Sequence, residues 1–240
     1  MEVEFIQQVF SEYGKQDHSV WKELYERRIG ELETQASEAY LQGLAALEIY
    51  PHQLPQLSDI NRRLGPITGW ESKAVTGFIP AAEFFTCLSR REFPTAITVR
   101  PADQLDYLPE PDIFHDVFGH IPMHAHEVFG AFLQKYGEVA LGAKTERQLT
   151  ELQRLFWFTV EFGLIREGGG LKLYGAGLIS SPGEGKHCLE SREVERLDFD
   201  LDKIIAQDFE IDHYQPILFV IDNYRQLYDS LDEYRQRHMS

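Results

Sequence analysis

The chain has 240 residues, with 23 Lys and Arg against 39 Asp and Glu, and its formal net charge is −16. With 43% hydrophobic and 26% charged residues, the composition is that of a globular protein and not of a disordered one. The acidity argues against nucleic acid and anionic membranes as partners, because both require a basic surface.

Signals for export are missing from the sequence. Residues 1–10 are acidic and lack the basic-then-apolar pattern of a signal peptide. No stretch reaches the roughly 18 apolar residues that are needed to span a bilayer. Cys87 and Cys188 are too few for a disulfide framework, although a single disulfide between them stays an alternative. We therefore expect a cytoplasmic protein with two reduced thiols.

The first part of the chain is predicted to be helical. Residues 18–49 form a long amphipathic pattern, continuous or broken once, which ends before Pro51. Ser58 is expected to cap a short helix through Leu64 that stops at Gly65-Pro66.

The remaining elements are predicted from their periodicity and from the positions of Pro and Gly. Helices are expected at 81–91 (after Pro80), 126–141, 146–167 and 222–236, short strands at 96–99, 171–174 and 217–221, and a loop or bulge at 175–177. No repeat, linker or composition break divides the chain. The expected fold class is therefore mainly α with a few short β-strands, in a single domain over residues 1–240.

The segment from Pro109 to Met123 is the densest in residues that can do chemistry. His115 and His120 lie five positions apart among apolar side chains, and a buried imidazole needs a polar partner or a metal ion. Backbone carbonyls are the alternative partners. Five residues is a poor spacing on a regular α-helix, so a shared ion requires a distortion there. His124 and His126 are expected at the surface.

A third ligand is predicted in the helical segment Leu155-Phe-Trp-Phe-Thr-Val-Glu-Phe-Gly-Leu-Ile165. Glu161 is the only charged residue in this stretch, and carboxylates on apolar surfaces are usually paired or bound to metal. A salt bridge with Arg100 or Arg166 is the alternative. Two histidines and one carboxylate form the facial triad of non-heme Fe(II) oxygenases, and the same set can hold Zn²⁺ in a hydrolase.

Aromatic residues are concentrated around these candidates. They suit a planar substrate or cofactor, although stripes of aromatic residues usually belong to the core. They are Phe84, Phe85, Phe114, Phe118, Phe156, Trp157, Phe158 and Phe162. Arg100 follows the predicted strand and is suited to bind a carboxylate, with Asp112 holding it in place, unless the two form an ordinary ion pair.

At this point the chain resembles the catalytic domain of the pterin-dependent aromatic amino acid hydroxylases, and most of all the short bacterial phenylalanine 4-hydroxylases. The resemblance runs from about Tyr13 to Asp222. Four motifs carry it in order: Tyr13 with His18-Ser-Val-Trp21, Pro109-Glu-Pro-Asp-Ile-Phe-His-Asp-Val-Phe-Gly-His-Ile-Pro122, Trp157-Phe-Thr-Val-Glu-Phe-Gly163 and Tyr174-Gly-Ala-Gly-Leu-Ile-Ser-Ser181.

The resemblance implies a role for each matching residue. The iron ligands would be His115, His120 and Glu161. The amino acid substrate would be bound by Arg100, Asp112, Trp157, Phe162, Gly177 and Ser180. The pterin would be bound by Gly77, Phe78, Ile79, Phe84 and Asp116, and Glu184 matches a further carboxylate near the active site.

Three positions bear on the choice of substrate. Tyrosine hydroxylases carry an aspartate where Ile211 aligns, and tryptophan hydroxylases usually have phenylalanine where this chain has Trp157. An apolar residue at the first position and a large wall at the second favour phenylalanine. Leu108 stands where the animal enzymes have a threonine in the substrate site.

The implied activity is hydroxylation of L-phenylalanine to L-tyrosine, with Fe(II), tetrahydrobiopterin or a related tetrahydropterin, and O₂ as cosubstrate. Tryptophan hydroxylation, a meta-hydroxylated product, a zinc hydrolase and an aromatic-binding module without turnover remain alternatives. We expect a monomer without a regulatory or tetramerisation domain. Its expected partners are the small-molecule amino acid substrate and, indirectly, pterin-recycling enzymes.

Overall fold

The computed structural model describes residues 3–77, 79–106, 110–211 and 213–239. Helices dominate and the strands are short, which confirms the expected mainly α class. The elements in chain order are η1 (Phe10–Glu12), α1 (Lys15–Gln35), α2 (Glu38–Ala46), α3 (Leu57–Thr68), β1 (Glu71–Val75), α4 (Ala81–Ser89), β2 (Glu92–Ala96), η2 (Phe114–His120), α5 (Ile121–His124), α6 (Glu127–Leu141), α7 (Glu146–Phe156), η3 (Trp157–Glu161), β3 (Leu164–Glu167), β4 (Gly170–Leu173), α8 (Ala176–Ser180), α9 (Pro182–Glu190), β5 (Glu195–Asp198), α10 (Leu201–Ala206), β6 (Ile217–Ile221) and α11 (Tyr224–His238).

The long helix predicted near the N-terminus is broken once, between α1 and α2. Ser37 lies at the break and its hydroxyl accepts a hydrogen bond from the backbone N–H of Tyr40, which caps α2. The backbone N–H of Ser37 donates to the carbonyl of Leu173 at 2.8 Å. The break therefore turns the chain at a point where it contacts β4.

Helix α3 corrects the prediction that the helix beginning near Ser58 ends at Gly65-Pro66. The helix continues through Pro66 to Thr68 and ends at Gly69, whose φ of 76° is left-handed. Its first residue is Leu57, so Ser58 lies inside the helix and does not cap it. The buried face of this helix, which includes Ile60 and Leu64, offsets the one hydrogen bond that a proline removes.

The strand predicted at residues 96–99 lies earlier in the chain. It is β2, and it pairs in parallel with β1, which was not predicted. The register aligns Glu71 with Glu92 and Val75 with Ala96. A residue of β2 can form sheet hydrogen bonds only where it lies opposite β1. The bounds of β2 are therefore set by its pairing with β1 and not by the β-branched residues of the local sequence.

A four-stranded sheet in the order β4-β3-β6-β5 corrects two further predictions. The helix predicted at 146–167 ends at Glu161, and residues 164–167 form β3, which pairs with β4 and β6. A Cβ on Gly163 would lie 2.1 Å from the ring of Tyr174, so only glycine fits where the helix gives way to the strand. The loop predicted at 175–177 begins helix α8.

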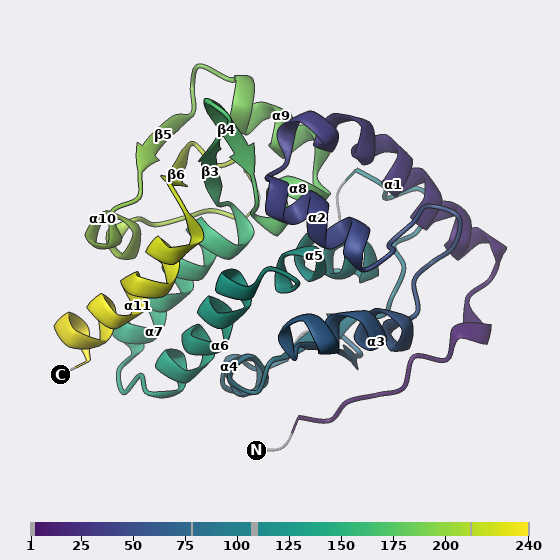
Figure 1. Cartoon of the computed structure of the whole chain (residues 1–240), viewed down its shortest axis with the longest axis horizontal. Coiled ribbons are helices and arrows are strands. Elements are labelled where there is room, and N and C mark those ends of the chain that lie inside the picture. The colour runs from purple at the N-terminus through teal and green to yellow at the C-terminus, as the bar shows by residue number, and fades with distance from the viewer. Residues whose placement is uncertain (1–2, 78, 107–109, 212, 240) are drawn as a thin grey trace.

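The core is continuous through the molecule. Helices α6, α7 and α11 lie side by side below the four-stranded sheet, and α1 and α2 cover the other end of the fold (Figure 1). The predicted helix at 126–141, strand at 217–221 and closing helix are confirmed as α6, β6 and α11. Cys87 and Cys188 are buried free thiols, as expected. None of the helices in the described ranges is long and apolar enough to cross a membrane.

Candidate metal centre and its surroundings

A π-helical turn resolves the spacing problem of His115 and His120. In η2 the N–H of Ile121 donates to the carbonyl of Asp116, five residues earlier, and such wide turns often occur at functional sites. Widening the turn brings residues five apart onto one face. The Nε2 atoms of the two histidines lie 3.2 Å apart, with the rings nearly perpendicular. The histidines therefore face each other, and not backbone carbonyls.

Glu161 reaches the same point from the other side. It ends η3, a second π-helical turn in which the N–H of Phe162 donates to the carbonyl of Trp157. Its carboxylate oxygens lie 3.2 Å from Nε2 of His120 and 3.6 Å from Nε2 of His115. The three ligand atoms lie within 4.8 Å of one another, the arrangement of a site for one metal ion.

Burial and charge shift the pKa of all three groups. Burial lowers the pKa of His115 to about 4, despite the carboxylate of Glu161 nearby. Burial also disfavours the charged form of His120, but Glu161 outweighs this and raises the pKa of His120. Burial would raise the pKa of Glu161, but the two imidazoles hold it below its usual range. The carboxylate is therefore ionised and a neutral imidazole is ready to bind a cation.

Ser180 fixes the orientation of His115. Its hydroxyl donates to the carbonyl of Ala176 at 2.8 Å and lies 2.9 Å from Nδ1 of His115. Because the hydroxyl proton is already used, its oxygen accepts from Nδ1–H, which leaves Nε2 of His115 free to bind metal.

Arg28 supports this arrangement and was missed in the sequence. Its side chain is fully buried and donates from Nε to the carbonyl of Ile179 at 2.7 Å and from Nη2 to that of Leu178 at 3.0 Å. These carbonyls lie in α8, next to Ser180. The local sequence of α1 does not distinguish Arg28 from the charged residues on the exposed face of this helix, so its burial could not be predicted.

Arg100 and Asp112 form a buried bidentate pair. Nε of Arg100 donates to Asp112 at 2.7 Å and Nη2 donates at 2.9 Å, while Nη1 donates to the carbonyl of Leu105 at 3.1 Å. Among the contacts of the described residues, one N–H on each terminal nitrogen of Arg100 has no acceptor, and a carboxylate could bind there. Asp112 also accepts from the backbone N–H of His115 at 3.0 Å, so this pair is attached directly to η2. Glu161 is paired with neither Arg100 nor Arg166, which contacts Asp198 and Asp222 instead.

Trp157 and Phe162 flank Glu161 in sequence and contact each other, with ring centroids 4.6 Å apart. Phe162 lies against α8, because a Cβ added to Gly177 would be 2.8 Å from its ring. Gly177 therefore allows a close approach between this aromatic pair and the helix that carries Ser180.

The residues matched to pterin binding are placed in part. Phe93 links Phe84 to the metal site, since its ring centroid lies 6.1 Å from that of Phe84 and 4.9 Å from that of His120. Asp116 is buried and accepts from the N–H of Ala96 at 2.7 Å, and burial raises its pKa to about 7. Gly77 and Ile79 are partly buried. Phe78 and Leu108 lie outside the described residues.

His124 corrects the expectation of a surface residue. It is fully buried, stacked on Trp70 at 4.8 Å and packed against Phe93 at 4.7 Å. Neither ring nitrogen has a hydrogen-bond partner among the described residues, and burial holds its pKa well below the usual value. His126 is half-buried and caps α6 by accepting from the N–H of Phe129. Neither histidine joins the ligand set.

The remaining substrate-related positions differ in exposure. Ile211 is 72% exposed, so its side chain points to solvent. Glu184 is buried and accepts from the backbone N–H of Gln215 at 2.8 Å. Sequence analysis did not identify Gln215. Pro216 and the apolar residues after it indicate only the start of a strand and give no sign of a role for Gln215.

The fold and the site together define a class. A mainly helical protein with two histidines and one glutamate facing a common point has the ligand set of mononuclear non-heme iron enzymes. Residues 4–239 match the family model "Biopterin-dependent aromatic amino acid hydroxylase". The chain belongs to this family, which confirms the resemblance of the four motifs.

Similar proteins extend this finding. The phenylalanine-4-hydroxylase of Chromobacterium violaceum is 41% identical over 198 residues, which cover 82% of this chain and 67% of the relative. A structure of that organism's enzyme with bound iron(III) and oxidised 7,8-dihydrobiopterin has a TM-score of 0.93 at 40% identity, over 97% of this chain and 85% of the other. Rat tyrosine 3-monooxygenase is 40% identical over 200 residues, 82% of this chain and 40% of its own length.

The residues present fit an iron ion. The imidazoles of His115 and His120 and the carboxylate of Glu161 converge from two π-helical turns. The hydroxyl of Ser180 orients His115 for metal binding. The geometry and the family agree, so the zinc hydrolase alternative loses its support.

Proposed function

We propose that this protein is a phenylalanine 4-monooxygenase that converts L-phenylalanine and O₂ to L-tyrosine with Fe(II) and a tetrahydropterin. One observation carries the proposal. Asp112 holds Arg100 and also binds the backbone of His115, so the anchor for a carboxylate and the metal ligands belong to one rigid unit. An amino acid held by its carboxylate at Arg100 would therefore lie near the metal ligands.

Iron and the tetrahydropterin would supply O₂ activation and the two electrons that the substrate C–H bond does not provide. The chain's own residues would do the positioning. Arg100 would hold the substrate carboxylate through its two unused N–H groups. Trp157 and Phe162 would exclude water and fix which ring carbon faces the metal. Ser180 would keep His115 in the tautomer that binds iron.

For pterin binding we propose the segment Gly77, Phe78 and Ile79, with Phe84 as the ring that stacks on the pterin and Asp116 as the nearby carboxylate. The support is the aromatic link through Phe93 to His120. We also propose a cytoplasmic monomer that acts as a single catalytic domain. Its two buried free thiols support the compartment, and light scattering tests the oligomeric state.

The decisive experiment is anaerobic reconstitution with Fe(II), followed by addition of O₂, tetrahydrobiopterin and one amino acid. We expect para-tyrosine from phenylalanine, in an amount that matches the tetrahydropterin consumed when coupling is complete. Meta-tyrosine, 5-hydroxytryptophan from tryptophan, or hydroxylation of tyrosine as the main activity would assign the site to one of the other products. Iron-loaded protein that hydroxylates none of the three would overturn the proposal.

Arg100 provides the test of substrate binding. Loss of one charge-assisted bidentate contact costs about 2–3 kcal/mol, so Arg100→Ala should raise the KM for phenylalanine by about 30- to 150-fold. Arg100→Lys is the matched control, because lysine keeps the positive charge but cannot make the bidentate contact of a guanidinium. Its KM should lie between those of the wild type and Arg100→Ala. Iron content should stay unchanged in both variants. An unchanged KM would remove Arg100 from the substrate site.

A further inference from the structure

Gln215 holds the edge of the Trp157 indole. Trp157 donates from Nε1 to Oε1 of Gln215 at 2.9 Å. The amide nitrogen of Gln215 donates to the carbonyls of Glu210 at 2.7 Å and His213 at 3.1 Å. Because both amide protons are used on carbonyls, the oxygen has to face the indole, and the side chain has one orientation.

The backbone of Gln215 is fixed as well. Its N–H donates to Oε1 of Glu184 at 2.8 Å, and Gln215 is 2% exposed. Glu184 lies in α9, whereas Trp157 lies in η3, four residues before Glu161. Gln215 therefore connects α9 to the turn that carries a metal ligand, and every polar group of its side chain is satisfied.

The same segment also contacts the face of the indole. Phe209 stacks on Trp157 with ring centroids 4.3 Å apart and an angle of 13° between the planes. A stacked ring can slide or turn, but a hydrogen bond at one edge fixes its rotation. Phe209 thus sets the plane of the indole and Gln215 its rotation, beside Phe162.

We propose that Gln215 is a positioning residue for substrate choice: it fixes the Trp157 indole as a rigid wall that admits a phenyl ring and rejects an indole ring. The proposal rests on the function proposed above, because it takes Trp157 as part of the amino acid pocket. Without the acceptor, a half-buried indole N–H loses its partner, and the ring turns to reach another acceptor or water. The pocket wall then becomes adaptable, and discrimination against tryptophan weakens.

The first measurement uses metal-free protein and does not depend on catalysis. Biosynthetic labelling with 5-fluorotryptophan gives one ¹⁹F signal for each of the three tryptophans, and Trp157→Phe assigns the signal of Trp157. Gln215→Met should shift or broaden that signal and leave those of Trp21 and Trp70 in place. A Trp157 signal that does not move would overturn the positioning role.

The second measurement compares kcat/KM for phenylalanine and tryptophan in the iron-loaded enzyme. Gln215→Met should lower the preference for phenylalanine about tenfold, the effect of one hydrogen bond, mainly through KM. In a Trp157→Phe background, Gln215→Met should have little further effect, because the indole N–H is already absent.

The two measurements separate the possible failures. A moved ¹⁹F signal with an unchanged preference would overturn the role in substrate choice and leave the proposed function intact. Full additivity of Gln215→Met and Trp157→Phe would also overturn it, because the two residues would then act independently. Wild-type protein without hydroxylase activity would instead overturn the proposed function, while the ¹⁹F result would still report on the contact.

Discussion

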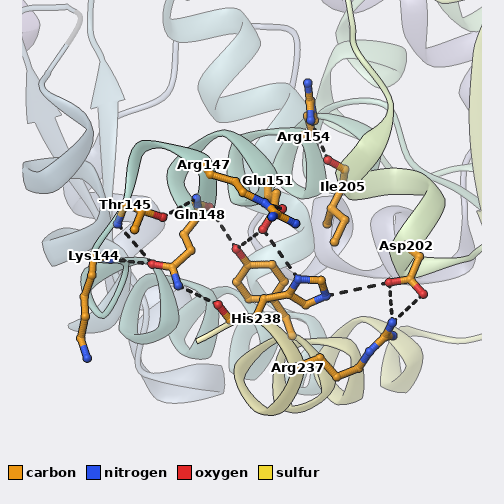
Figure 2. Close-up of polar contacts among 11 residues, drawn as sticks. Lys144, Thr145, Arg147, Gln148, Glu151, Arg154, Asp202, Ile205, Arg237 and His238 are labelled. Atoms are coloured by element: carbon orange, nitrogen blue, oxygen red, sulfur yellow. Dashed lines mark hydrogen bonds and ion pairs between the residues drawn. The ribbon is translucent and has the colours of Figure 1, made fainter. Parts of the chain in front are cut away.

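Glu151 and Glu161 lie ten positions apart on one continuous helical segment. Glu151 is buried, Glu161 is half-buried, and each lies near histidine. Glu151 accepts from Nε of Arg147 at 2.7 Å and from the hydroxyl of Tyr234 at 2.9 Å, with His238 further away at 3.9 Å. Figure 2 shows this cluster, where the end of α11 meets α7 and α10. Glu161 is ion-paired with two imidazoles and with neither Lys nor Arg among the described residues.

The difference between the two carboxylates lies in their partners. A guanidinium and a phenol satisfy Glu151, so its cluster connects three helices and needs no further ligand. Among the described residues, Glu161 is ion-paired only with the imidazoles of His115 and His120, and both of these can also bind metal. The same residue types therefore give a structural clamp at one end of the segment and a metal centre at the other.

Removing the two carboxylates in turn tests this comparison most strongly. Glu161→Ala should abolish stoichiometric iron binding. Loss of a residue that only hydrogen-bonds to a metal ligand already lowers metal affinity by about 10- to 100-fold, and loss of a ligand itself should cost more. Glu151→Ala should bind iron as the wild type does. Metal analysis after anaerobic reconstitution checks both. Full iron content in Glu161→Ala would remove this residue from the ligand set.

Ser180 and Ser181 extend the comparison to adjacent hydroxyls. Ser180→Ala removes the acceptor for Nδ1 of His115, so iron affinity should fall by about 10- to 100-fold. Ser181 instead caps α9 by accepting from the N–H of Glu184, and Ser181→Ala should cost about 1 kcal/mol of stability. Competition with a metal chelator measures the affinity. Equal iron affinity in both variants would contradict the role of Ser180.

Sequence reasoning succeeded where the signal is local or chemical. The helix at 126–141 and the strand at 217–221 show periodic or continuous apolar patterns, and both are present. Glu161 was found because a lone charge in an apolar run needs a partner. His115 and His120 were found for the same reason, although their spacing argued against them.

The errors arose where distant segments decide the conformation. The π-helical turns of η2 and η3 depart from the regular period of 3.6 residues, so the apolar pattern of the sequence did not predict them. His124 is buried because Trp70, which precedes β1, stacks on it. One local signal was overlooked: Gly163 lies inside the predicted helix at 146–167, and it marks the close approach of Tyr174 where the helix ends.

Glu151 should affect stability and not iron binding. Glu151→Gln weakens the interaction with Arg147 and perturbs the bond from Tyr234, so we expect a loss of about 1–3 kcal/mol in the free energy of unfolding. Glu138→Gln is the control, since Glu138 is exposed on α6. Urea denaturation of the metal-free proteins provides the measurement. A stability equal to that of the control would show that the clamp contributes nothing.

Glu184 is another buried carboxyl, and no cation is ion-paired with it in the described part of the chain. Burial raises its pKa from 4.5 to about 7, the opposite direction from Glu161. Between these values the folded protein keeps a proton that the unfolded chain has lost. The stability contributed by this group is therefore present below pH 4.5, falls as the pH rises to about 7, and is constant above that.

Glu184→Gln should remove this pH dependence, because the amide oxygen still accepts from the N–H of Gln215 but does not titrate. We expect the difference in unfolding free energy between wild type and variant to change by about 1 kcal/mol across the window, since water screens part of the burial cost. Measuring the difference cancels the contributions of Asp116 and the histidines. Parallel stability curves from pH 4.5 to pH 7 would show that the pKa of Glu184 is not raised in the folded protein. Glu184 would then be ionised at neutral pH as Glu161 is, and the two carboxylates would differ only in their partners.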